Sequence, residues 1–181
     1  MRAAQLTRLE GPDGIEVGEI DEPTGDGVVV EVHAAGAAFP DALLTRGLYQ
    51  YRPDPPFVLG AEIAGVVRSA PQDANVKPGD RVVGLTMLTG GMAEVAVLAP
   101  DRVFKLPDNV SFTAGAGLLF NDLTMYFALT VRGRLRSGDT VLVHGAAGGI
   151  GTSTLRLASV LGASRTVSYN LSHHVGVPCD F

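Results

Sequence analysis

The amino-acid sequence predicts a chain of mixed α+β and α/β class: a β-rich N-terminal domain, then the first strand–loop–helix unit of a parallel, doubly wound sheet. Two observations support this fold class. Up to about residue 110, short β-prone segments alternate with turn-forming clusters of Gly, Pro and Asp. From about residue 111, helical periodicity begins, and a glycine-rich loop later joins an apolar strand to a second helix.

The N-terminal part contains six β-prone segments and one short helix. The helix is expected over residues 40–47, with Pro40 near its start, Asp41 in its first turn and Gly47 at its end. Many strands at this spacing, interrupted by one helix, are typical of a small barrel or sandwich. The six predicted strands cover residues 15–20, 28–36, 62–70, 80–87, 92–99 and 102–107.

The C-terminal part begins with apolar residues at helical spacing over residues 111–134, and Ser111 is a suitable N-cap. The apolar run 140–144 is typical of a parallel strand covered on both faces. A helix follows over residues 152–163, ended by a glycine, and residues 165–169 are expected to begin a second strand.

The loop HGAAGGIG, residues 144–151, lies where a dinucleotide-binding domain holds its phosphates. The three positions of the G-x-G-x-x-G pattern fall on Ala146, Gly148 and Gly151. They serve a tight turn, close approach of the backbone to a pyrophosphate, and packing of the helix on the strand. The helix N-terminus adds free N–H groups and partial positive charge. The alternative is a tight glycine turn that binds nothing.

The cofactor-binding residues expected here are Ala146, Ala147, Gly148, Gly149, Ile150 and Gly151. An acidic residue that grips the ribose hydroxyls of NAD usually follows about 20 positions later. Residues 165–170 contain no Asp or Glu, which favours NADP over NAD because a carboxylate would repel the 2′-phosphate.

The bulk properties exclude several classes. The net charge of −5 and isoelectric point near 5.3 argue against a nucleic-acid-binding surface. A single cysteine cannot form an internal disulfide, and neither a signal peptide nor an apolar run long enough for a membrane span is recognisable. We therefore expect a soluble, cytoplasmic protein without a membrane partner.

Six blocks occur in order along residues 1–167: MRAAQLTRLEGPDGIEV, EVHAAGAAFPDALLTRGLY, PPFVLGAEIAGVV, KPGDRVVGL, GGMAEVAVL and TVLVHGAAGGIG. They resemble the medium-chain dehydrogenase/reductase superfamily, most closely its zinc-independent quinone oxidoreductase branch. The resemblance implies a chaperonin-10-like catalytic domain over residues 1–115 and the start of a Rossmann domain over residues 116–167. It also implies NADPH as cofactor, with NADH as an alternative, and leaves residues 168–181 as a divergent tail.

The resemblance also implies that no zinc is bound. Where the metal-dependent branch has its Cys and His ligands, this chain has Ala38 and Ala61, and the third ligand position falls near Phe120 or Asn121. None of these side chains is a thiolate, imidazole or carboxylate, the ligand types that Zn²⁺ requires.

The implied reaction is hydride transfer from NADPH to a small-molecule electron acceptor, a quinone or an α,β-unsaturated carbonyl. Tyr49 matches a tyrosine that looks like the proton donor in the related enoyl-thioester reductases. The alternative role for Tyr49 is packing, and Tyr51 is a neighbouring candidate for the donor. Asn121 and Thr124 match the segment that faces the nicotinamide, or else are polar positions on a helix. An enoyl-thioester reductase and a non-catalytic β module are the alternative functions.

The resemblance fails after residue 167, where the family continues for about 150 further residues. We therefore expect a truncated form with an incomplete Rossmann domain and impaired turnover. Its exposed strand edge suggests a homodimer. A metal tract formed by His173, His174 and Cys179 is disfavoured because their spacing is not that of a metal site.

Overall fold

The computed structural model describes residues 1–169, which form two compact units divided after residue 119 and taken one at a time below. The domain limits expected from the sequence, at residues 115 and 167, remain predictions. The expected tail, including His173, His174 and Cys179, lies outside the described residues.

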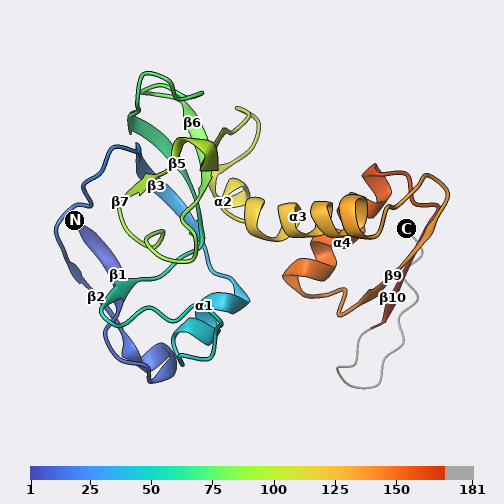
Figure 1. Ribbon diagram of the computed structural model, residues 1–181, viewed down its shortest axis with the longest axis horizontal. Coiled ribbons are helices and arrows are strands. Elements are labelled where there is room, and N and C mark those ends of the chain that lie inside the picture. Colours follow the sequence, from blue (N-terminus) through green and yellow to red (C-terminus); the bar gives the residue numbers. More distant parts are fainter. Residues whose placement is uncertain (170–181) are drawn as a thin grey trace. The chain divides into compact units, whose positions relative to one another are not determined.

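The first unit is the predicted β-rich domain, built from two antiparallel sheets (Figure 1). The smaller sheet has the strand order β2-β1-β4 and the larger one the order β7-β3-β5-β6-β8. Their bounds are β1 Arg2–Leu6, β2 Ile15–Glu19, β3 Val28–Gly36, β4 Phe57–Val58, β5 Glu62–Ser69, β6 Arg81–Leu85, β7 Val95–Leu98 and β8 Val103–Lys105.

All six predicted strands are present, whereas β1 and β4 were not predicted. The sequence of β1, RAAQL, contains no β-branched or aromatic residue, so its strand signal is weak. Pairing with β2 along its whole length, and with β4 at Gln5 and Leu6, makes it the central strand of its sheet. Tertiary pairing, rather than local preference, therefore produces this strand.

The core of the larger sheet is made of β-branched side chains that alternate along its strands. Val28 and Val30 on β3 are fully buried, as are Ile63 on β5 and Val82 on β6. Alternate residues of a strand point to the same face, so these side chains share one face of the sheet, while Ala64 and Val83 on the other face form a separate buried cluster with Leu106 and Ala116. A third cluster, Leu6, Leu44 and Leu59, joins the smaller sheet to the short helix α1 (Phe39–Leu44).

Short helices connect the strands of this unit, η1 (Gly11–Gly14), α1 and η2 (Pro100–Arg102), and α2 (Phe112–Gly115) follows the last strand. The predicted helix over residues 40–47 is α1 with the turn that follows it. Gly47 ends that turn with φ of +64°, a backbone conformation that favours glycine. Ser111 is the predicted N-cap of α2, and its Oγ accepts a hydrogen bond from Ala114 N at 3.1 Å.

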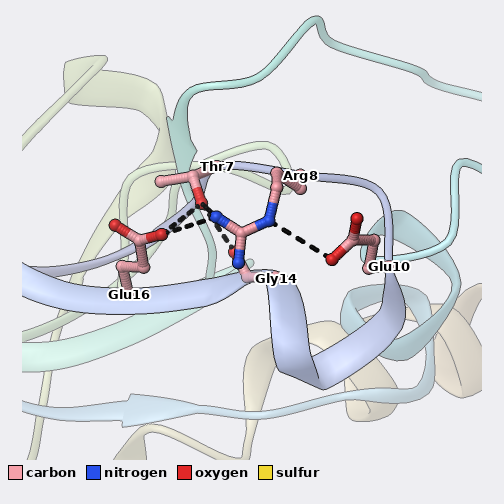
Figure 2. A network of polar contacts seen from close by, with 5 residues as sticks. All are labelled: Thr7, Arg8, Glu10, Gly14 and Glu16. Carbon is pink, nitrogen blue, oxygen red and sulfur yellow. Dashed lines mark hydrogen bonds and ion pairs between the residues drawn. The ribbon is translucent and has the colours of Figure 1, made fainter.

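A polar network lies on the surface between β1 and β2, where Arg8 reaches two carboxylates (Figure 2). Its Nε donates to Glu10 at 3.2 Å and its Nη1 donates to Glu16 at 2.8 Å. The hydrogen bond from Arg8, followed by one from Thr7, holds the pKa of Glu16 below its usual value. The groups are exposed, so this network fastens the β1–β2 connection with little effect on stability.

Arg81 fixes the segment that leads from β8 into α2. Its Nη1 donates to Pro107 O at 2.9 Å and its Nη2 to Val110 O at 2.6 Å. The guanidinium carbon also lies 4.5 Å from the centre of the Phe112 ring, within cation–π range. One side chain of β6 therefore satisfies two carbonyl groups of this connection and packs on the first residue of α2.

The second unit contains α3 (Leu119–Tyr126), a π-helical segment (Phe127–Arg132), β9 (Thr140–His144), α4 (Gly149–Val160) and β10 (Arg165–Tyr169). The strands β9 and β10 pair in parallel, with Thr140 opposite Arg165 and His144 opposite Tyr169. Helix α4 joins them and packs on both. This confirms the predicted strand–loop–helix–strand unit of a doubly wound sheet.

Two expectations for this unit need correction. The helix predicted over residues 111–134 is divided into α2, α3 and the π-helical segment, with a turn at residues 116–118 that follows Gly115 and contains Gly117. The strand at 140–144 was expected to be covered on both faces. In the described part of the chain Val143 is buried, but Leu142, which points to the opposite face, is 59% exposed.

Candidate functional site

The glycine-rich loop turns at Gly145, which follows β9 directly. Gly145 has φ of +70°, and its N donates to Tyr169 O at 2.8 Å, which extends the pairing of β9 with β10 by one bond. Ala146 is buried and does not have positive φ, so the alanine in the first fingerprint position is compatible with the turn. The left-handed residue of this turn is therefore the glycine one position earlier.

The loop ends at Gly148, the N-cap of α4, whose backbone is extended at φ −81° and ψ 172°. The first hydrogen bond of the helix runs from Thr152 N to Gly148 O at 2.8 Å. The N–H groups of Gly149, Ile150 and Gly151 precede this bond, so the helix itself offers them no acceptor. Among the described residues no side chain caps this end of α4, which leaves an array of donors at the positive end of the helix dipole.

The glycines of the loop differ in what a side chain would meet. A Cβ on Gly151 would lie 2.4 Å from both Ala146 Cα and Gly145 O, so this glycine is required for the helix to pack on the loop. A Cβ on Gly149 would lie 2.7 Å from Asn121 Nδ2. A Cβ on Gly148 would meet only Gly145 O at 3.5 Å, an ordinary contact. The space in front of Gly148 is thus open for a ligand.

Asn121 and Thr124, expected at the nicotinamide end, both lie on α3. The side-chain amide of Asn121 lies against Gly149, so the structure brings this residue to the loop. The Thr124 hydroxyl donates to Phe120 O at 2.6 Å, one turn back on the same helix. Its proton is therefore committed, while its oxygen can still accept a hydrogen bond.

Tyr49, the expected proton donor, belongs to the first unit. Its ring is half-buried against the cluster of Leu6, Leu44 and Leu59, and its carbonyl accepts a hydrogen bond from Arg52 Nε at 3.0 Å. The neighbouring candidate Tyr51 is 47% exposed. The packing that was considered as the alternative role for Tyr49 is therefore present.

Asp41 links the two segments that contain Ala38 and Ala61, the alanines expected in place of zinc ligands. Its Oδ2 accepts from Ala38 N at 2.7 Å, and its Oδ1 accepts at 3.1 Å from Gly60 N, the residue before Ala61. Burial raises the pKa of Asp41 above its usual value, although both N–H groups act in the opposite direction. Across residues 1–169 no group of three or more His, Cys, Asp or Glu is arranged to hold a metal ion.

Sequence reasoning missed three residues of this region: Gly145, Asp122 and Ser153. Gly145 could have been found because the turn residue of such a loop needs positive φ, and Gly145 is the first glycine after the strand. The contact between Asp122 on α3 and Ser153 on α4 has no comparable signal, since it joins residues 31 positions apart.

No helix in the described part of the chain has the length and apolar character that crossing a membrane requires.

Comparison with known proteins agrees with this geometry. Residues 24–108 match the alcohol dehydrogenase GroES-like domain. Mouse quinone oxidoreductase is 33% identical over 90% of this chain and 50% of its own length. The chain spans about half the length of the curated relatives it matches.

Two solved structures show the same fold at higher coverage of this chain. A probable oxidoreductase from Mycobacterium abscessus has a TM-score of 0.88 and 41% identity, over 95% of this chain and 62% of its own. The quinone oxidoreductase from Thermus thermophilus, solved also as its complex with NADPH, has a TM-score of 0.79 and 31% identity, over 93% of this chain and 60% of its own. The chain therefore contains an alcohol dehydrogenase GroES-like domain and is similar to the N-terminal half of quinone oxidoreductases of the medium-chain dehydrogenase/reductase superfamily.

Proposed function

We propose that this chain carries the cofactor-phosphate site and the substrate-side domain of an NADPH-dependent oxidoreductase of the quinone reductase type. The observation that carries the proposal is Gly148, which faces open space although its own backbone angles suit any residue. A glycine that the fold does not need is accounted for by a ligand that approaches the backbone closely.

The chain's own part in the reaction is to bind and orient. The N–H groups of Gly149, Ile150 and Gly151 would donate to the pyrophosphate, and the dipole of α4 would favour its negative charge. The open surface of Gly148 allows the phosphates to come within hydrogen-bond distance. NADPH, when bound, supplies the hydride.

The acceptor we propose is a quinone or the β-carbon of an α,β-unsaturated carbonyl. Support comes from the quinone oxidoreductases among the relatives and solved structures that the chain resembles. Hydride transfer to such an acceptor leaves an anionic oxygen or carbon that must take up a proton. Tyr49 is our proposed donor, although its ring also packs in the first unit.

Two finer features belong to the same proposal. The chemistry is zinc-independent, because Ala38 and Ala61 stand where the metal-dependent branch has ligands and offer no donor atom on their side chains. The preference is for NADPH over NADH, because residues 165–169 of β10 carry no carboxylate. Residue 170, the last position of the expected ribose-binding segment, lies outside the described residues.

Fluorescence titration of the purified chain with NADPH, and in parallel with NADH, tests the proposal. We expect saturable binding with a dissociation constant in the micromolar range for NADPH and weaker binding for NADH. Turnover with a quinone and with an enoyl thioester, for the wild type and Tyr49→Phe, then separates the two acceptor classes. An absence of saturable binding by a folded chain would contradict the proposal and favour a non-catalytic β module.

A further inference from the structure

We propose that Asp122 is a positioning residue, which locks α3 onto α4 and thereby seats the side-chain amide of Asn121 at the entrance of the phosphate loop. The effect of this clamp on the cofactor rests on the proposed function, in which the loop binds NADPH. It assigns a role to a set of residues, Asp122, Ser153 and Arg156, that the sequence pattern did not single out.

One carboxylate oxygen of α3 contacts two side chains of α4. Asp122 Oδ1 accepts a hydrogen bond from the hydroxyl of Ser153, and Arg156 Nη2 lies 2.8 Å from the same oxygen. Ser153 is fully buried, and Asp122 has a side-chain exposure of 23%. The Arg156 side chain is 56% exposed, so the buried hydrogen bond to Ser153 is the part of this contact that holds its geometry best.

The partners of α3 lie on one stripe of α4. Gly149, Ser153 and Arg156 are spaced i, i+4 and i+7, which places them on the same face of the helix. Two consecutive residues of α3 contact this stripe: Asp122 at Ser153 and Arg156, and Asn121 at Gly149. The polar clamp and the contact at the loop are therefore parts of one helix–helix interface.

Asn121 occupies the space that any side chain at position 149 would take, since a Cβ there would lie 2.7 Å from its Nδ2. The absence of a side chain at Gly149 lets the amide lie directly beside the first free N–H groups of α4. In the described part of the chain no hydrogen bond holds the Asn121 side chain, so the rotation of α3 about its axis decides where the amide points. Asp122, the next residue, is the group that fixes that rotation.

The consequence concerns the cofactor. An amide Nδ2 at the first turn of α4 adds a neutral side-chain donor to the backbone donors of Gly149, Ile150 and Gly151. Loss of the clamp leaves the loop intact but moves this donor. The clamp therefore acts on binding through Asn121, not through the backbone of the loop.

A double-mutant cycle on NADPH binding tests this route. Asn121→Ala and Asp122→Asn are each expected to weaken NADPH about tenfold, and the double variant to be no weaker than Asn121→Ala alone. Ser164→Ala is the matched control, because it removes a hydroxyl that donates to Gly138 O at 2.7 Å in the same unit. It is expected to leave NADPH binding unchanged. Independent effects, giving about hundredfold loss in the double variant, would overturn the proposal.

A second measurement needs no cofactor. In NMR spectra of the free chain, the Asn121 side-chain amide is expected to show a nuclear Overhauser effect to the Gly149 Hα protons. This signal should vanish in Asp122→Asn and persist in Ser164→Ala. Its persistence in folded Asp122→Asn would overturn the proposal, whether or not NADPH binds. If Asp122→Asn does not fold, Ser153→Ala takes its place and is expected to weaken the same signal.

The two measurements separate the two claims. If the wild type does not bind NADPH, the proposed function fails, and the nuclear Overhauser effect alone decides the role of Asp122. If the wild type binds NADPH and the cycle is additive, the proposed function stands and the positioning role is wrong.

Discussion

The glycines of the proposed phosphate loop show how identical residues can serve different purposes. Gly145 provides positive φ, Gly151 lets α4 pack against Ala146, and Gly149 makes room for Asn121. Gly148 has none of these internal duties. The four glycines therefore separate the needs of the fold from those of a ligand, and substitutions can distinguish them.

Gly148→Ala is expected to fold like the wild type and to bind NADPH at least tenfold more weakly. Its Cβ meets only one ordinary contact in the free chain but would stand between the backbone and the pyrophosphate. Urea unfolding and NADPH titration check the two parts of this prediction. A variant that binds NADPH as well as the wild type would contradict the assignment of the phosphate site.

Gly151→Ala provides the contrast at the same loop. Its Cβ would lie 2.4 Å from backbone atoms that cannot move away cheaply, so the free energy of unfolding should fall by about 3 kcal/mol. The loss should be visible in urea unfolding without any cofactor.

Asp41 is expected to give an unusual pH dependence of stability. Its pKa is raised by burial, so the folded state holds the proton more tightly than the unfolded state does. The free energy of unfolding that it contributes therefore falls as the pH rises from about 3.8, the usual value, through the raised folded value. Urea unfolding of the wild type and Asp41→Asn at several pH values should show a difference that shrinks over this range.

Glu16→Gln is the comparison variant, because the pKa of Glu16 is shifted in the opposite direction to that of Asp41. Arg8 lowers the pKa of Glu16, so the part of the free energy of unfolding that Glu16 contributes is lost as the pH falls. Asp41→Asn should also be less stable by about 1–3 kcal/mol, since its amide nitrogen would face a backbone N–H. A difference between wild type and Asp41→Asn that grows with pH would show that hydrogen bonding outweighs burial.

At the scale of elements, the connection from β8 to α2 depends on Arg81. Arg81→Ala removes two charge-assisted hydrogen bonds to carbonyls and the contact with Phe112, so we expect a loss of about 2 kcal/mol in the free energy of unfolding. Arg68→Ala is the matched control, because Arg68 makes only an exposed ion pair with Glu22 and should cost less than 1 kcal/mol, about the value of a surface salt bridge. Equal losses in urea unfolding would contradict the role of Arg81.

The elements show where a sequence suffices to predict structure. Strands rich in valine, such as Val28–Gly36, and the apolar strand before the loop were predicted because their side chains carry a strong β signal. The strand Arg2–Leu6 was missed because tertiary pairing produces it. The break of the helix predicted over 111–134 was missed because its apolar spacing continues through the turn at 116–118.

The candidate site was predicted in the same uneven way. The glycines of the loop 145–151 form a local pattern that a tight turn between strand and helix requires, so the position of the loop could be predicted. The contact of Asn121 with Gly149, and that of Asp122 with Ser153, depend on how two helices pack and leave no trace in local spacing. Reasoning from motifs found the backbone donors and missed what holds the side chains around them.

At the scale of the whole molecule, the described residues give the second unit a parallel sheet of two strands, covered by α4 on one face. Leu142 and Val167, 59% and 41% exposed, leave apolar surface on this unit. The open backbone donors at the start of α4 lead us to expect that the chain binds NADPH, as proposed above.

The most direct measurement is a titration of the ¹⁵N-labelled chain with NADPH, followed by the chemical shifts of its backbone amides. We expect the largest shifts at the N–H groups of Gly149, Ile150 and Gly151, which have no acceptor within the helix. Asn121 Nδ2 should shift with them. Saturating NADPH that leaves these amides unchanged, or shifts only residues elsewhere, would contradict the central claim that this loop is the phosphate site.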